Sequence, residues 1–166
     1  MSTIVLYIYK ILVLFLPETR FFELKRYILN VAGAKIGKGV KICSSVTIIG
    51  NGDLEIGDYC WIGPKTFIST TKPAIIKIGK NVDIAPMTYL GTGSHRVNPY
   101  GSRIAGDGFS GDINVGDGVW ICAGVFLLPN SNVGSMTIVA PCSVVKGNIS
   151  EFKLAAGNPC KVIKSL

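Results

Sequence analysis

The chain contains a single histidine, His95, and its imidazole is the side chain best suited to moving a proton near neutral pH. A histidine base can take the proton from a hydroxyl group and then pass it to a leaving group. Covalent catalysis would also need a nucleophile beside this base, and the adjacent Ser94 is a weak candidate. The group that orients the imidazole stays open between Asp107, Asp112 and a backbone carbonyl.

His95 stands where the only long insertion in an otherwise repetitive sequence begins. This insertion, residues 96–112, is rich in glycine and in polar side chains that suit a hydroxyl-rich ligand such as a sugar. Long glycine-bearing loops are usually functional or disordered. We therefore expect it to form a lid or a wall of the substrate site, with Asn98, Tyr100 and Arg103 as the substrate-binding residues. The sequence does not name the substrate.

The elements that position these residues follow from a repeat of six. An aliphatic residue recurs at positions 36, 42 and 48, then 56, 62 and 68, then 78, 84 and 90, then 115, 121 and 127, then 133, 139 and 145. Neither a helix nor an alternating strand has this period, so it indicates a stacked solenoid. All extra residues fall between groups of three, as they do when loops leave a triangular coil at one corner. The pattern predicts about five triangular coils, with small residues in second place where the backbone bends and a bulky side chain would crowd the next turn.

Residues 1–33 lack the repeat. Residues 4–16 are apolar except for Lys10, and this run is shorter than the roughly 20 residues of a membrane span. It also lacks the basic start and cleavage site of a signal peptide. Apolar residues then recur at helical spacing up to residue 31, so we expect two short helices. These either cap the solenoid or contact another subunit, or they lie on a membrane surface with Arg20, Lys25 and Arg26 at the headgroups.

The composition limits the partners. There are 17 Lys and Arg against 10 Asp and Glu, a net charge of +7, and the basic residues are dispersed. This suits an anionic, nucleotide-bearing cofactor better than nucleic acid. One histidine and five cysteines without a CxxC motif argue against a metal site. They favour reduced, packing cysteines in a cytoplasmic protein.

Three motifs, TGSH at 92–95, VW at 119–120 and AAGNPCKVIK at 155–164, carry a resemblance over residues 33–166. The chain resembles the hexapeptide-repeat acyltransferases, in particular the galactoside, maltose and exopolysaccharide O-acetyltransferases. The resemblance implies an all-β solenoid, a left-handed parallel β-helix, that assembles as a homotrimer. We expect a helical cap over residues 1–33, the β-helix over 34–150 with a long loop at 96–114, and a capping and cofactor-binding segment over 151–166.

The resemblance also assigns roles. His95 would be the general base in direct transfer from acetyl-CoA to a sugar hydroxyl. The backbone of Cys122 and Ala123, in the neighbouring subunit, would hold the oxyanion. Among the other cofactor-binding residues, Trp120 would shield the thioester. The cofactor phosphates would be bound by three lysines: Lys146, Lys161 and Lys164.

The sequence departs from the family at four places. Arg96 stands where some relatives have an acid after the histidine, and Ala123 where some carry a hydroxyl that meets the cofactor sulfur. Pro141 has no N–H to offer the pantetheine arm. Lys72 replaces an acidic acceptor residue of galactoside-type relatives, so a galactoside or maltose acceptor is not carried over.

Four other functions are compatible with a solenoid of this kind. N-acetylation of an amino sugar or of an antibiotic stays open, as does a non-catalytic structural solenoid. Carbonic anhydrases built on this coil need three histidines to bind zinc, so the single histidine argues against that function. Sugar-nucleotide transferases need a further nucleotide-binding domain, for which 166 residues leave no room. We expect a cytoplasmic protein, peripheral at the inner face of the membrane if the N-terminal helices touch lipid.

Overall fold

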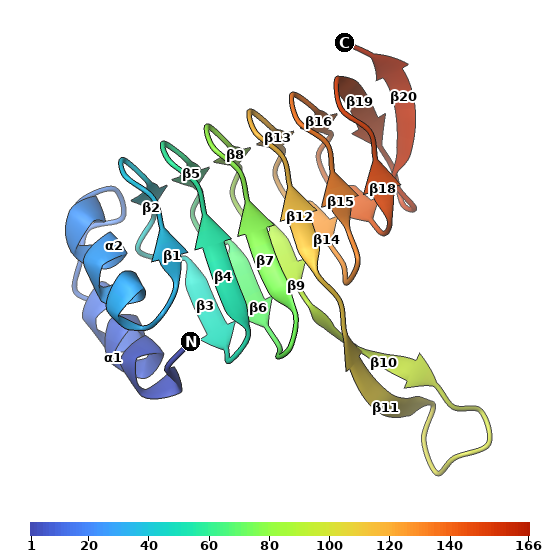
Figure 1. The fold of residues 1–166 in the computed structure, drawn as a ribbon, viewed down its shortest axis with the longest axis horizontal. Helices are drawn as coiled ribbons and strands as arrows, with labels where there is room; N and C mark the ends of the chain where they lie inside the picture. The colour runs from blue at the N-terminus through green and yellow to red at the C-terminus, as the bar shows by residue number, and fades with distance from the viewer.

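The structure is a computed structural model that describes residues 1–166. Two helices cover one end of a stack of β-coils, and the C-terminal strand closes the other end (Figure 1). The helices are α1 (Thr3–Val13) and α2 (Phe22–Val31). Neither has the length and hydropathy that a membrane crossing requires.

Three sheets form the sides of the coil, and all their strands pair in parallel except the C-terminal strand of sheet B. Sheet A contains β1 (Lys35–Ile36), β4 (Asp53–Ile56), β7 (Ile75–Ile78), β12 (Ile113–Val115), β15 (Asn132–Val133) and β18 (Asn148–Ile149). Sheet B contains β2 (Lys41–Ile42), β5 (Trp61–Ile62), β8 (Asp83–Ile84), β13 (Trp120–Ile121), β16 (Ile138–Val139), β19 (Lys153–Ala156) and β20 (Lys161–Ser165). Sheet C contains β3 (Thr47–Gly50), β6 (Phe67–Thr70), β9 (Tyr89–Gly91), β14 (Phe126–Leu127) and β17 (Val144–Val145).

The predicted repeat positions map directly onto these sheets. The first residue of each hexapeptide is buried, and successive positions fall on sheets A, B and C in turn. Each short strand places one aliphatic side chain inside and its neighbour outside, because side chains alternate across a strand. The predicted fold, a β-solenoid of the left-handed parallel β-helix type with N-terminal helices, is confirmed.

The coil count and the position of the bend differ from the prediction. Sheet A has six rungs rather than five, because β18 pairs with β15 and begins a sixth turn, which continues in sheet B where β19 pairs with β16. The second-place glycines do avoid a clash, since a Cβ on Gly57 would lie 2.6 Å from the Gly79 carbonyl oxygen. The bend itself is at the fourth place, where Tyr59, Asn81 and Met136 adopt positive φ. The small second residue therefore serves coil stacking, and the fourth residue turns the corner.

The helices pack on the first coil. Leu6, Tyr9 and Val13 of α1 and Leu29 of α2 join the buried core. The fully buried Lys25 donates from Nζ to Ser44 Oγ at 3.1 Å, which ties α2 to the first coil. Burial lowers the pKa of this lysine.

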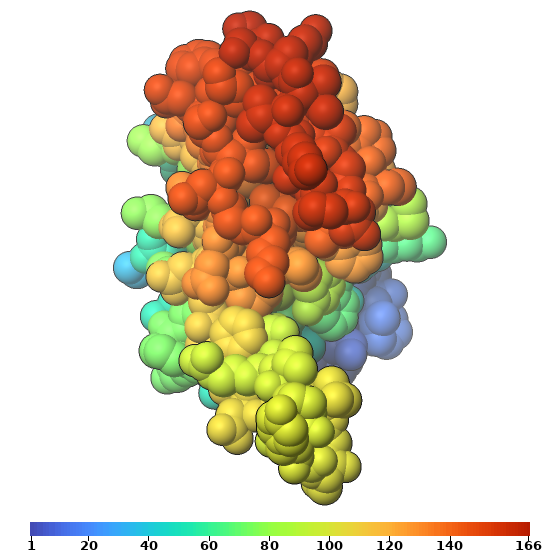
Figure 2. Space-filling view, turned by 90° about the vertical axis from the view of Figure 1, so that its right-hand side faces the viewer, coloured from blue at the N-terminus to red at the C-terminus, as the bar shows by residue number.

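The segment for which a long loop was predicted, residues 96–114, contains regular structure. It is an antiparallel hairpin of β10 (Gly93–Val97) and β11 (Ala105–Ser110), which projects from the body between β9 and β12 (Figures 1 and 2). Backbone groups held away from the body have no other protein partner, so they pair with each other. Residues 98–104 alone form the connection at its tip.

Candidate active site

His95 lies on β10, exposed on the projecting arm. It pairs across the hairpin with Gly108, and the register shifts between His95 and Val97. Because side chains alternate along a strand, Arg96 lies on the other face, where its guanidinium stands 5.8 Å from the Phe109 ring. This sets the imidazole apart from the only cation adjacent to it in the chain.

A backbone carbonyl orients the imidazole. His95 Nδ1 lies 2.9 Å from the carbonyl oxygen of Gly106 on the opposite strand. A carbonyl oxygen only accepts, so Nδ1 carries the proton in this hydrogen bond and the neutral ring keeps its free lone pair on Nε2. Of the three partners left open by the sequence, the carbonyl is the one observed. Asp112 is engaged elsewhere, because its Oδ1 accepts the Ile75 N–H at 2.9 Å.

His95 lines a cleft of about 340 Å³ formed by the hairpin alone. Asn98, Arg103 and Asp107 line the same cleft, whereas Tyr100 is 98% exposed and lies outside it. Asn98 helps to hold the tip, since its Oδ1 accepts the Tyr100 N–H at 3.2 Å. The cleft therefore combines a base with an amide, a guanidinium and a carboxylate, which suits a polar, hydroxyl-bearing ligand.

The second group of predicted residues lies on and after β13. Trp120 is half exposed on the outer face of sheet B, in register between Asp83 and Ile138. Trp61, on the same face, packs against Phe22 at 6.2 Å between ring centroids. Trp120 has no aromatic partner, so its exposed ring is available to a ligand.

The two predicted oxyanion donors differ. The Cys122 N–H donates to the Val139 carbonyl oxygen at 3.0 Å as part of the coil. The Ala123 N–H makes no hydrogen bond within the chain, although the Ala123 carbonyl accepts from Cys142 N at 3.0 Å. Only Ala123 has a backbone donor free for a ligand.

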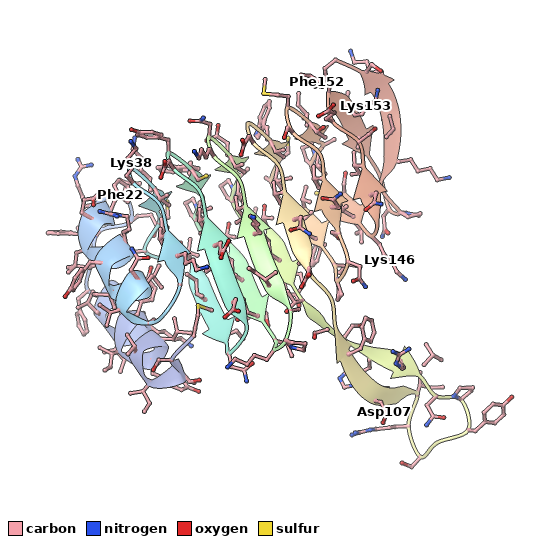
Figure 3. The ribbon with its side chains drawn as sticks, in the orientation of Figure 1. Phe22, Lys38, Asp107, Lys146, Phe152 and Lys153 are labelled. Atoms are coloured by element: carbon pink, nitrogen blue, oxygen red, sulfur yellow. The ribbon has the colours of Figure 1, made fainter.

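The three predicted phosphate ligands belong to the last coils but lie on different sides of them. Lys161 and Lys164 are exposed on β20, and Lys146 is exposed just after β17. Cys160 N donates to the Val144 carbonyl at 2.8 Å, which starts the lysine-bearing strand beside β17. Lys146 is drawn on these coils in Figure 3, with Asp107 on the separate hairpin arm.

The structure does not bring these groups together within one chain. The hairpin with His95 extends from the junction of sheets C and A, whereas sheet B with Trp120 lies on the opposite side of the coil (Figure 1). One chain thus presents a proton-transfer group and a candidate thioester-binding surface that face different directions.

Comparison with known proteins identifies the family. No protein-family model matches the chain. It is 32% identical to WcaF of Escherichia coli K12, named as a colanic acid biosynthesis acetyltransferase, over 143 residues that cover 86% of this chain and 75% of WcaF. The chain belongs to the hexapeptide-repeat sugar acetyltransferases.

Other members share part or all of the fold. Galactoside O-acetyltransferase of E. coli K12 is 34% identical over 91 residues, 55% of this chain. The present chain spans less than half of the length of that enzyme and of two yeast acetyltransferases that it matches, 44–47% of each. The acetyltransferase VCA0836 of Vibrio cholerae, solved with acetyl coenzyme A, is 25% identical with a TM-score of 0.65 over 99% of this chain and 86% of that one.

The structure narrows two alternatives that the sequence left open in the candidate site. A backbone carbonyl was one of three partners considered for His95, and the carbonyl observed is that of Gly106. The N–H groups of Cys122 and Ala123 were predicted together, and only that of Ala123 is without a partner in the chain. No residue type marks either group, because both depend on how neighbouring strands and coils pair.

Proposed function

We propose that the protein is an acetyl-CoA-dependent O-acetyltransferase that modifies a sugar or a polysaccharide precursor, with His95 as general base. The observation that carries this proposal is the hydrogen bond from His95 Nδ1 to the Gly106 carbonyl. It leaves Nε2 as the proton acceptor at the edge of a polar cleft. The names of WcaF and galactoside O-acetyltransferase support a sugar acceptor.

Transfer proceeds in two proton movements. His95 Nε2 removes the proton from the acceptor hydroxyl while its oxygen attacks the thioester carbonyl carbon. The carbon–sulfur bond then breaks, and the imidazolium gives the same proton to the departing coenzyme A thiolate. No residue becomes acylated, and Ser94 does not line the cleft. The Ala123 N–H donates to the oxyanion that forms between these steps, in place of the predicted Cys122–Ala123 pair.

The cofactor occupies sheet B and the C-terminal end. Trp120 shields the thioester, and Lys146, Lys161 and Lys164 contact the phosphates through charge-assisted hydrogen bonds. Asn98 and Arg103 bind the acceptor in the cleft. Tyr100 lies outside the cleft of its own chain, so it contacts only an acceptor that is bound at the site of a neighbouring chain.

The active assembly is a homotrimer in which the hairpin of one chain lies against sheet B of the next. The separation of His95 from Trp120 within one chain supports this arrangement, because neither surface alone forms a complete site. A closed cyclic assembly gives every hairpin a partner.

The experiment measures thiol release from acetyl-CoA against a panel of sugars and sugar-lipids, for the wild type and for His95→Ala, with coenzyme A binding measured in parallel. We expect acceptor-dependent release that falls by about 10²- to 10⁴-fold in the variant, while coenzyme A binding is kept. Equal rates in the two proteins would refute the role of His95. If the protein does not bind coenzyme A, the transferase proposal is wrong. A non-catalytic structural role for the solenoid would then be the better explanation.

A further inference from the structure

The helical cap exposes large apolar side chains that are not packed into the core. On α1 and just after it, six large apolar side chains are 56–82% exposed: Ile4, Tyr7, Ile8, Ile11, Leu14 and Phe15. Beside them on and before α2, four more are 40–67% exposed: Phe21, Leu24, Tyr27 and Val31. We call these ten residues the cap face.

Packing of the fold does not account for the cap face. The inward side of α1, with Leu6, Tyr9 and Val13, already meets the coil. The outward residues recur at intervals of three and four, which places them on one face of the helix. A surface helix needs only one apolar side to fold onto its protein. A large exposed apolar patch on the other side therefore indicates a binding surface.

The charges beside the cap face are positive. Lys10 and Arg20 are exposed, and a helical wheel puts Lys10 at the border between the outward and inward sides of α1. Of the two acids in residues 1–33, Glu23 pairs with Arg26 at 2.6 Å, whereas Glu18 Oε1 only accepts a hydrogen bond from Ser45 Oγ at 2.7 Å. Four Lys and Arg against two Glu leave this segment with a net positive charge.

We propose that the cap face docks on an anionic phospholipid surface, with α1 lying in the plane of the membrane. Apolar side chains would enter the acyl boundary, and Lys10 and Arg20 would reach the lipid phosphates. The phenolic hydroxyls of Tyr7 and Tyr27 suit the same boundary, because an aromatic ring with a polar end favours it.

A second copy of the chain fits this surface less well. Two cap faces meeting about a twofold axis would place the cations of both copies in one interface, because the same patch is used twice. Like charges gathered in one interface oppose association. An anionic lipid surface instead satisfies both the apolar side chains and the two cations. This inference does not depend on the transferase activity.

Vesicle co-sedimentation tests the proposal with the whole chain. The probes are vesicles of phosphatidylcholine alone and of phosphatidylcholine mixed with phosphatidylglycerol. We expect binding to the anionic vesicles that weakens as salt rises. Lys10→Gln with Arg20→Gln should lower the affinity by about 30-fold, since each cation near such a surface contributes about five-fold. The control Lys65→Gln with Lys80→Gln removes two exposed lysines from the coil and should change little.

The apolar contribution has its own pair of variants. Leu14→Ser with Phe15→Ser should abolish vesicle binding while thermal unfolding stays near that of the wild type, because both side chains are exposed. Met136→Ser with Phe152→Ser removes two half-exposed apolar side chains from the last coils and should keep binding. Phe152 is labelled in Figure 3, at the end of the solenoid opposite the helices. Absence of binding by the wild type at low salt would overturn the proposal. So would cap-face variants that keep vesicle binding but change the oligomeric state in light scattering, because a second copy would then cover the face.

Discussion

The role of the Gly106 carbonyl can be tested by adding one methyl group. A Cβ at Gly106 would lie 2.7 Å from Asn98 Cβ and 3.1 Å from the Arg96 carbonyl oxygen. Ordinary contacts of a Cβ begin at 3.4 Å, so Gly106→Ala must move the strands by about 0.7 Å. Since the carbonyl that holds His95 belongs to this residue, the shift acts directly on the imidazole.

The expected loss follows from the size of that shift. Displacing a catalytic group by about 1 Å costs on the order of 100-fold in rate. We therefore expect Gly106→Ala to lower kcat for acetyl transfer by about 10- to 100-fold. Coenzyme A binding and thermal unfolding should change little, because the hairpin projects from the body. The assay is acceptor-dependent thiol release, with coenzyme A affinity measured by calorimetry.

Gly108→Ala is the matched control on the same strand. Gly108 pairs with His95 itself, yet a Cβ there would meet only the Ser94 carbonyl oxygen, at 3.9 Å. We expect this variant to keep nearly wild-type kcat. Wild-type activity in Gly106→Ala, or an equal loss in Gly108→Ala, would refute the claim that the carbonyl positions the base.

Three further predictions concern stability. Tyr9 is buried with no hydrogen-bond partner for its hydroxyl, and burial raises the pKa of that hydroxyl. Tyr9→Phe should therefore increase the free energy of unfolding, measured in urea, by about 1 kcal/mol. A decrease would mean that the hydroxyl has a hydrogen-bond partner. Burial raises the pKa of the Cys43 thiol from 9.0 to about 11, so the stability it contributes is present below pH 9 and lost as pH rises through 11. Cys43→Ala should therefore show a smaller fall in unfolding free energy over this range, and an unchanged fall would contradict the assignment. Gly50→Ala should lose about 3 kcal/mol or more, since its Cβ would overlap the Thr70 carbonyl at a φ of 103°. Gly147→Ala, with a φ of 93° and nothing within 4 Å, should lose only about 1 kcal/mol in the same titration, and equal losses would exclude the clash.

The fold could be predicted because the repeat is a local rule applied many times. Each aliphatic residue at a first place became an inward side chain, and every insertion left the same corner. The prediction ended where that rule weakened. At the sixth turn, backbone pairing carried the coil beyond the last clear hexapeptide, as the pairing of Val139 with Ala155 shows.

The site was less predictable because its geometry depends on pairing between distant residues. His95 was identified from its place at the start of the insertion. Its partner Gly106 is eleven residues away, and the strand register shifts beside the hydrogen bond, between His95 and Val97. Likewise, Cys122 and Ala123 are adjacent and chemically similar in their backbones. Only the position of Val139 in the next coil determines which N–H stays free.

The fold itself gives a physical reason for a site shared between chains. Each face of the solenoid is a sheet of short, hydrogen-bonded rungs whose aliphatic residues fill the interior, so a substrate can lie only on the outer surface of the coil. An insertion at a corner can carry a base away from the sheets, but it then exposes that base to water, as it does for His95. Excluding water and supplying an oxyanion donor such as Ala123 then requires a second surface, and sheet B of another chain offers one. The projecting hairpin is therefore the feature that most strongly supports the proposed trimer. Its outer part packs on no other element of its own chain, so only contact with another chain can enclose the cleft beside His95.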